Sequence, residues 1–194
     1  MIKIARDAEF NRDQVLRQAM LVFWEKGYEA TSIPDLLKAM GLSRSSLYNT
    51  FGDKRALFLE ALRFYQKQMD SRQEILNRAT SVKEGITEYF NQRIESAYST
   101  EHPKGCMTTN TSIELSTPDN QLKELVKNRF LGLENSFYQL LEKGRLSGEI
   151  KSTTDTKSLA CLFMNLNHSI NIMGKVNIDR LHIGQMIKAV INII

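Results

Sequence analysis

Residues 33–51 read IPDLLKAMGLSRSSLYNTF, the pattern of two short helices joined by a glycine turn. Pro34 falls in the first turn of the first helix, where a missing N–H costs little. Gly41 ends that helix at a position that favours positive φ, and Ser43 can cap the second helix. Two short helices around a glycine within about 20 residues are typical of a helix-turn-helix.

The second of these helices leaves a polar, non-acidic set of side chains on its outer side. The set comprises Arg44, Ser45, Ser46, Tyr48, Asn49 and Thr50. Arginine pairs with guanine and asparagine with adenine in the major groove, while hydroxyl groups reach phosphates or base edges. Lys54, in the first turn of the next helix, would add its charge to backbone N–H groups that favour a phosphate. The alternative is a three-helix packing unit with a solvated polar face.

The run from Gly41 to Phe58, GLSRSSLYNTFGDKRALF, resembles the DNA-binding signature of the TetR/AcrR family. The resemblance covers roughly the first 65 residues. It implies an all-α homodimeric transcriptional regulator, most often a repressor, with a three-helix domain on DNA and a larger domain for effector binding and dimerisation.

By position, the resemblance implies the DNA contacts of individual residues. It places Arg44 and Ser45 near bases, Thr31, Tyr48 and Lys54 near phosphates, and Asn49 and Thr50 at the groove edge. Ser45 stands where glycine is frequent in the family, and Asn49-Thr50 replaces a common aromatic or histidine pair. The resemblance therefore implies DNA binding without giving the operator sequence.

The rest of the chain repeats apolar residues every three or four positions, which predicts an all-α fold of about nine helices. The expected helices cover 11–26, 33–40, 43–51, 53–79, 82–97, about 106 to before Pro118, and three more after Asp119, Asp155 and Asp179. We expect a DNA-binding domain at 1–52 and a sensing and dimerisation domain at 53–194, connected by the helix 53–79.

Composition and charge favour a soluble cytoplasmic protein. The 194 residues are 42% hydrophobic and 25% charged, with a net charge of +4 that suits a polyanionic partner but is equally common in other proteins. No apolar run approaches 18 residues, and residues 1–10 are too charged for a signal peptide. Two cysteines without metal-ligand spacing indicate a reduced compartment. We expect no membrane contact.

In the TetR family the effector cavity lies among the middle helices of the larger domain. The candidate lining residues here are Tyr89, Phe90, Asn110, Glu114, Phe130, Phe137, Asn167 and His168. For each of them a place in the core or at the surface is the favoured alternative to a ligand contact. Asn165, Asn167, His168 and Asn171 make a polar patch on an otherwise apolar helix, which interhelical hydrogen bonding would explain.

Cys106 is a candidate redox or electrophile sensor. It follows Gly105 at the start of a helix with Lys104 close by, and both the helix start and the lysine favour the thiolate. The Gly-Cys entry also resembles a subgroup of the family that includes sensors of electrophiles and oxidants. The alternative is a small packing residue, and Cys161, in the middle of an apolar helix, is expected to be inert.

The last two helices carry apolar residues on nearly every side, and such helices must be covered all round. In the family they form a four-helix dimer interface with their symmetry mates, so we expect a homodimer through them. Burial inside a monomer is the alternative. The effector is an unidentified small molecule.

The sequence contains no enzyme motif. Ser/His/Asp order, HExxH, a phosphate-binding glycine loop and paired carboxylates are all missing, and His102, His168 and His182 are scattered. We expect no catalytic activity, no cofactor and no metal. The second functional hypothesis is a helical protein-interaction module.

Overall fold

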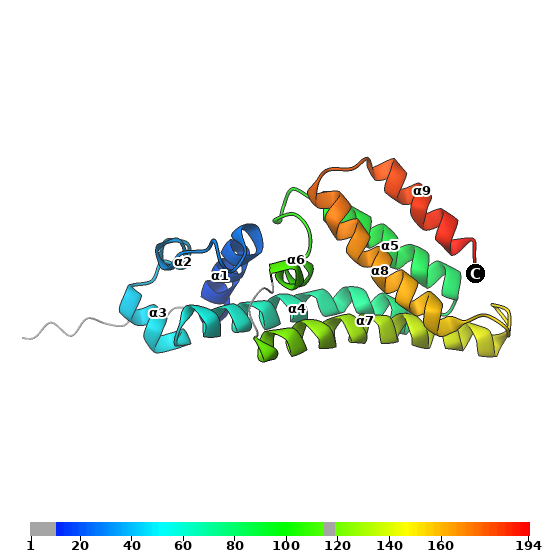
Figure 1. Cartoon of the computed structure of the whole chain (residues 1–194), viewed down its shortest axis with the longest axis horizontal. Coiled ribbons are helices and arrows are strands. Elements are labelled where there is room, and N and C mark those ends of the chain that lie inside the picture. The colour runs from blue at the N-terminus through cyan, green and yellow to red at the C-terminus, as the bar shows by residue number, and fades with distance from the viewer. Residues whose placement is uncertain (1–10, 115–118) are drawn as a thin grey trace, which may run out of the picture. The chain divides into compact units, whose positions relative to one another are not determined.

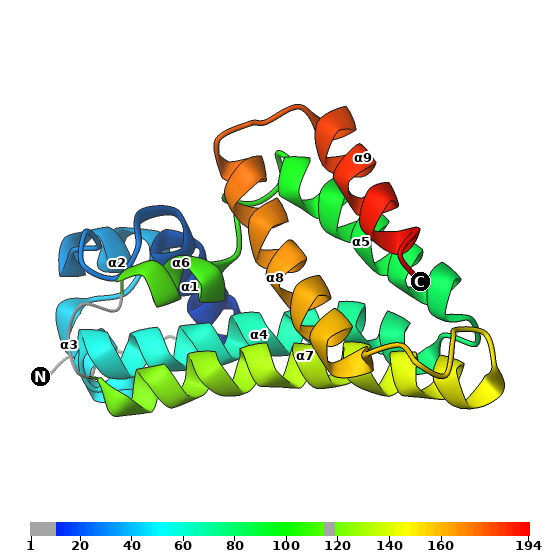
Figure 2. The ribbon, with the colours of Figure 1, turned by 45° about the vertical axis from the view of Figure 1, so that its right-hand side comes forward.

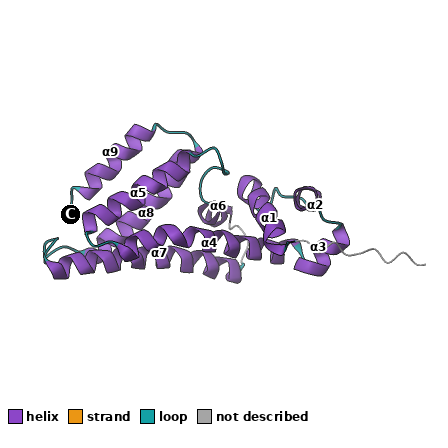
Figure 3. Cartoon of the chain, turned by 180° about the vertical axis from the view of Figure 1, so that it is seen from behind, coloured by secondary structure: helices purple, strands orange, loops and turns teal. Residues whose placement is uncertain are grey.

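The computed structural model describes residues 11–114 and 119–194, and every regular element in those ranges is an α-helix (Figures 1 and 3). The helices in these ranges are α1 (Arg12–Lys26), α2 (Ile33–Met40), α3 (Arg44–Phe51), α4 (Lys54–Arg78), α5 (Val82–Tyr98), α6 (Met107–Glu114), α7 (Asn120–Ser147), α8 (Thr156–Lys175) and α9 (Arg180–Ile191). The predicted all-α fold of about nine helices is confirmed. The expected absence of a signal peptide at 1–10 and the expected end of the sixth helix before Pro118 concern residues outside the described ranges.

The chain divides into two compact units, residues 1–64 and 65–194. Helix α4 begins in the first unit and ends in the second, and the predicted division after residue 52 falls just before this helix starts. None of the helices in the described ranges combines the length and hydropathy needed to cross a membrane.

The first unit packs α1 to α3 and the start of α4 around an aromatic core. Asn11 caps α1 by accepting from the backbone N–H groups of two residues in its first turn. The rings of Phe23 and Phe58 meet edge to face with centroids 5.0 Å apart, and Tyr28 lies 4.9 Å from Phe58. These contacts join α1 and the turn that follows it to the start of α4.

The second unit is built around a cluster of phenylalanines. Phe90 of α5, Phe137 of α7 and Phe163 of α8 lie 5.5 to 5.9 Å apart between ring centroids, and each is fully buried. Helix α8 packs on α5 and α7, while α9 lies along α5 (Figure 2). The polar end of this core, toward α4 and α6, is where a cavity forms.

Candidate DNA-binding helix and sensing cavity

The turn between α2 and α3 has the geometry of a helix-turn-helix. Ser32 and Asp35 form a capping box at the start of α2, with the Asp35 N–H 3.2 Å from Ser32 Oγ and the Ser32 N–H 3.0 Å from Asp35 Oδ2. Lys26 Nζ lies 2.8 Å from Asp35 Oδ1, and this hydrogen bond lowers the pKa of Asp35 below its usual value. Gly41 ends α2 in the left-handed region at φ 65°.

Helix α3 turns its apolar residues inward and its polar residues outward. Leu47 and Phe51 are buried, whereas Arg44, Ser45, Tyr48 and Asn49 are exposed and Ser46 and Thr50 are half-buried. Ser43 caps the helix by accepting from the Ser46 N–H at 3.1 Å. The outward face of α3 therefore carries the six residues that the sequence indicated, and it is free of acidic side chains.

Thr31 and Lys54, both expected near phosphates, have partners within the first unit. Thr31 is 1% exposed, and its hydroxyl donates to the Gly27 carbonyl oxygen at 2.6 Å. That hydroxyl therefore stabilises the turn before α2 and does not face outward. Lys54 is the first residue of α4, with Nζ 4.5 Å from the centroid of the Tyr28 ring.

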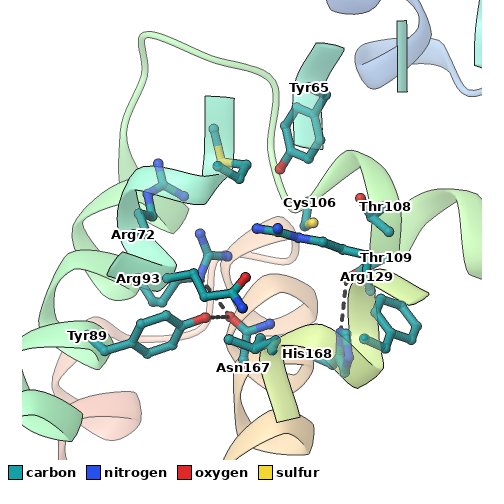
Figure 4. A pocket seen from close by; sticks show the side chains of 14 residues that line it. Tyr65, Arg72, Tyr89, Arg93, Cys106, Thr108, Thr109, Arg129, Asn167 and His168 are labelled. Atoms are coloured by element: carbon teal, nitrogen blue, oxygen red, sulfur yellow. Dashed lines mark hydrogen bonds between the residues drawn. The ribbon is translucent and has the colours of Figure 1, made fainter. Parts of the chain in front are cut away.

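The second unit contains a small cavity of about 50 Å³, shown in Figure 4. Its lining comes from helices α4 to α8 and from Cys106, directly before α6. The lining residues are Tyr65, Met69, Arg72, Gln73, Tyr89, Arg93, Cys106, Thr108, Thr109, Arg129, Phe130, Leu133, Asn167 and His168. A cavity needs about 10–15 Å³ to hold one water molecule, so this one has room for about three to five non-hydrogen atoms.

The structure brings five of the candidate sensing residues to this cavity and leaves four elsewhere. Those at the cavity are Tyr89, Cys106, Phe130, Asn167 and His168. Those elsewhere are Phe90 and Phe137 in the phenylalanine cluster and Asn110 and Glu114 on α6. Sequence reasoning missed the three arginines. A signal for Arg93 was present, because it lies four residues after Tyr89 and thus on the buried stripe of α5.

Arg93 is the centre of a buried polar network between α5 and α8. It is 6% exposed, its Nε donates to Asn167 Oδ1 at 2.9 Å, and its Nη2 donates to Asn171 Oδ1. The Tyr89 hydroxyl donates to the same Asn167 oxygen at 3.0 Å. The predicted interhelical hydrogen bonding of Asn167 and Asn171 is confirmed, whereas Asn165 is exposed and donates to the Cys161 carbonyl of its own helix.

Cys106 lies directly before α6 and is half-buried at the cavity wall. Burial raises the pKa of its thiol, but the positive charge of Arg93 and hydrogen bonds from Tyr65 and Thr109 outweigh burial, so the pKa lies below its usual value. The sequence had assigned this effect to Lys104 and the helix start. Lys104 Nζ instead reaches the Ser99 carbonyl oxygen at 3.3 Å, and the neighbouring cation is Arg93.

His168 closes the cavity from α8 as a neutral ring. Burial and the charge of Arg93 both lower its pKa below the usual value. Its Nε2 lies 3.0 Å from the Met164 sulfur and its Nδ1 3.1 Å from the Thr109 hydroxyl. We assign the proton to Nε2, since sulfur can only accept, and Nδ1 then accepts from Thr109.

Two family models match the helix-turn-helix and most of the second unit. Residues 15–61 match the model for bacterial regulatory proteins of the tetR family, and residues 83–190 match the tetracyclin repressor-like C-terminal domain. The chain belongs to the TetR family. It is a TetR-family transcriptional regulator, in agreement with the resemblance seen in residues 41–58.

Relatives within the TetR family match along most of the chain. The uncharacterized HTH-type transcriptional regulator YezE of Bacillus subtilis is 35% identical over 91% of this chain and 92% of the relative. The HTH-type transcriptional repressor ComR of Escherichia coli is 32% identical over 80% and 75%. The solved structure of a CifR cysteine mutant with 26-base-pair operator DNA superposes with a TM-score of 0.87, at 28% identity over 96% and 98% of the two chains.

Proposed function

We propose that this regulator is a repressor that binds operator DNA in the cytoplasm as a homodimer and leaves it in response to a small-molecule or thiol-reactive signal. The observation that carries the proposal is the outward face of α3, where Arg44, Ser45, Tyr48 and Asn49 are exposed with no acidic neighbour on the helix. The similarity to ComR, whose name describes a repressor, and to CifR on its operator supports the same function.

The outward residues of α3 divide into base and phosphate contacts. In the proposed complex Arg44 and Ser45 approach bases, with the arginine fork suited to guanine. Ser46, Asn49 and Thr50 lie at the edge of the groove. The buried Thr31 hydroxyl donates to the Gly27 carbonyl oxygen, so we assign the phosphate contacts to Tyr48 and Lys54.

The dimer is proposed to form through α8 and α9. These helices and their flanking residues expose large apolar side chains in the single chain: Leu162 at 39%, Ile172 at 50%, Leu181 at 67% and Ile193 at 67%. Covering them with a second copy removes apolar surface from water. A symmetric dimer would also set two α3 helices about one DNA turn, roughly 34 Å, apart.

Release is proposed to start at the cavity of the second unit. An occupant that binds one conformation of the dimer more tightly than another shifts the population toward it. Modification of Cys106 at the cavity wall would act at the same place, since the thiol contacts Tyr65 and Thr109. The occupied form would hold the two α3 helices at a spacing that no longer fits the operator.

A mobility-shift titration of the purified chain on the DNA upstream of its own gene tests the proposal. We expect saturable binding in the nanomolar range that weakens steeply as salt rises, because phosphate contacts release counterions. A well-formed dimer that shifts neither this DNA nor any neighbouring promoter at low salt would contradict the proposal. That result would favour the helical protein-interaction module.

A further inference from the structure

The cavity of the second unit carries an excess of positive charge. Arg72 of α4, Arg93 of α5 and Arg129 of α7 all line it (Figure 4), while none of its fourteen lining residues is aspartate or glutamate. Asp70 pairs with Arg129 at 2.5 Å. The guanidinium groups of Arg72 and Arg93 are then left without a carboxylate partner in the cavity.

Neither Arg72 nor Arg93 forms an ion pair within residues 11–114 and 119–194. The hydrogen-bond partners of Arg93 are the neutral amides of Asn167 and Asn171. Arg72 also borders a neighbouring open hollow that contains Glu95, but Glu95 pairs with Arg180. Burial and the nearby charge of Arg93 lower the pKa of Arg72, as expected for a half-buried cation held close to a second one.

Buried charges in proteins are normally paired, because an unpaired one loses its hydration without compensation. We propose that the cavity binds a small organic carboxylate, held by Arg93 together with Arg72, and that this is the chemical class of the effector. Only the role of this carboxylate as the effector rests on the proposed function, because its binding to the cavity requires no DNA.

The other walls of the cavity favour an organic carboxylate over an inorganic anion. Met69, Phe130 and Leu133 add apolar surface, which would cover a short hydrocarbon tail and which phosphate does not need. The guanidinium fork of Arg72 can match a carboxylate with two parallel hydrogen bonds, while Arg93, whose Nε and Nη2 donate to Asn167 and Asn171, adds its charge. The volume of about 50 Å³ suits an occupant of about the size of propionate.

Cys106 is a second anion candidate in the same cavity, because the charge of Arg93 favours the thiolate form of its side chain. The carboxylate we propose binds reversibly and forms no bond to sulfur. Cys106→Ser should therefore leave carboxylate affinity within about threefold of the wild type. A covalent sensor would behave differently, since the serine variant would lose the response.

Isothermal titration calorimetry of the full chain, in a low-chloride buffer, tests the inference with three probes of matched size: propionate, its neutral isostere propionamide, and inorganic phosphate. We expect propionate to bind about tenfold or more tightly than either other probe, since only propionate offers both a planar anion and an apolar tail. Equal affinity of propionate and propionamide, or no propionate binding, would overturn the proposal. Tighter binding of phosphate would overturn the assignment to a carboxylate.

Two variants on helix α4 make a matched pair. Arg72→Gln removes a charge from the cavity and should weaken propionate about tenfold, whereas Arg78→Gln removes an 82%-exposed charge and should change nothing. Arg72 is half-buried and Arg78 is exposed, and circular dichroism would verify that both variants fold. Equal propionate affinity in the two variants would refute a role for Arg72. Operator release by propionate is measured separately, so failure of DNA binding and failure of this inference give distinct results.

Discussion

At the scale of single residues, Arg93 depends on two asparagines of α8. Asn171→Ala would remove the amide oxygen that accepts from Arg93 and leave a buried guanidinium nitrogen without that partner. We expect a loss of about 2–3 kcal/mol in the free energy of unfolding, measured by urea denaturation followed by circular dichroism. Asn135→Ala, at an exposed position of α7, should change the free energy of unfolding by less than about 0.5 kcal/mol. Equal effects of the two variants would show that Arg93 does not need Asn171.

The lowered pKa of the Cys106 thiol leads to a second prediction for a single residue. In a Cys161→Ser background, the ultraviolet absorbance of the thiolate should titrate below the usual pKa of 9.0, because Arg93, Tyr65 and Thr109 together outweigh burial. Arg93→Gln should move the midpoint upward. A midpoint at or above the usual value in the Cys161→Ser protein would contradict this.

The same lowered pKa affects stability in a defined direction. Between the folded-state pKa of Cys106 and the unfolded value near 9.0, the folded chain binds fewer protons than the unfolded chain. The contribution of the thiolate to the free energy of unfolding therefore rises with pH across that window. It is complete above the unfolded value and is lost as the pH falls through the folded value.

At the scale of elements, the turn between α2 and α3 depends on Gly41. A Cβ added there meets nothing within 4 Å, so the cost of Gly41→Ala comes from the left-handed backbone alone, about 1–2 kcal/mol. Trp24, the only tryptophan and buried in the first unit, should report the loss by fluorescence during urea denaturation.

Gly132→Ala is the matched control for that substitution. Gly132 lies inside α7 with equally open surroundings and without a positive φ. There alanine should raise the free energy of unfolding by about 0.5–1 kcal/mol, followed by circular dichroism. A Gly41→Ala chain as stable as the wild type would show that the turn tolerates other geometries.

The elements that the sequence predicted well are those set by local signals. Ser32, Gly41 and Ser43 act on their own neighbours, so the bounds of α2 and α3 follow from the sequence within a residue or so. The cavity was predicted in part, since Tyr89 and His168 lie on recognisable helical stripes. The role of Arg72 was hidden, because an arginine on a long polar helix is usually solvated and only the packing of α5 to α8 around it creates the cavity.

At the scale of the whole molecule, dimerisation is testable through one exposed leucine of α9. Leu181→Asp would place a charge in the proposed interface and should give a monomer in analytical ultracentrifugation, with weakened operator binding. Leu146→Asp makes the same change at a 78%-exposed leucine near the end of α7, outside α8 and α9, and should remain dimeric. A dimeric Leu181→Asp protein would place the interface elsewhere.

If α3 reads operator DNA, two arginine variants compared by fluorescence anisotropy on the operator should differ in affinity. Arg44→Ala should lose specific binding, by about 1–3 kcal/mol or more, while the chain stays folded and dimeric. Arg78→Ala removes the same charge from the exposed side of α4 in the second unit and should bind as the wild type does. Equal operator affinity of Arg44→Ala and Arg78→Ala would show that α3 does not read operator DNA through Arg44.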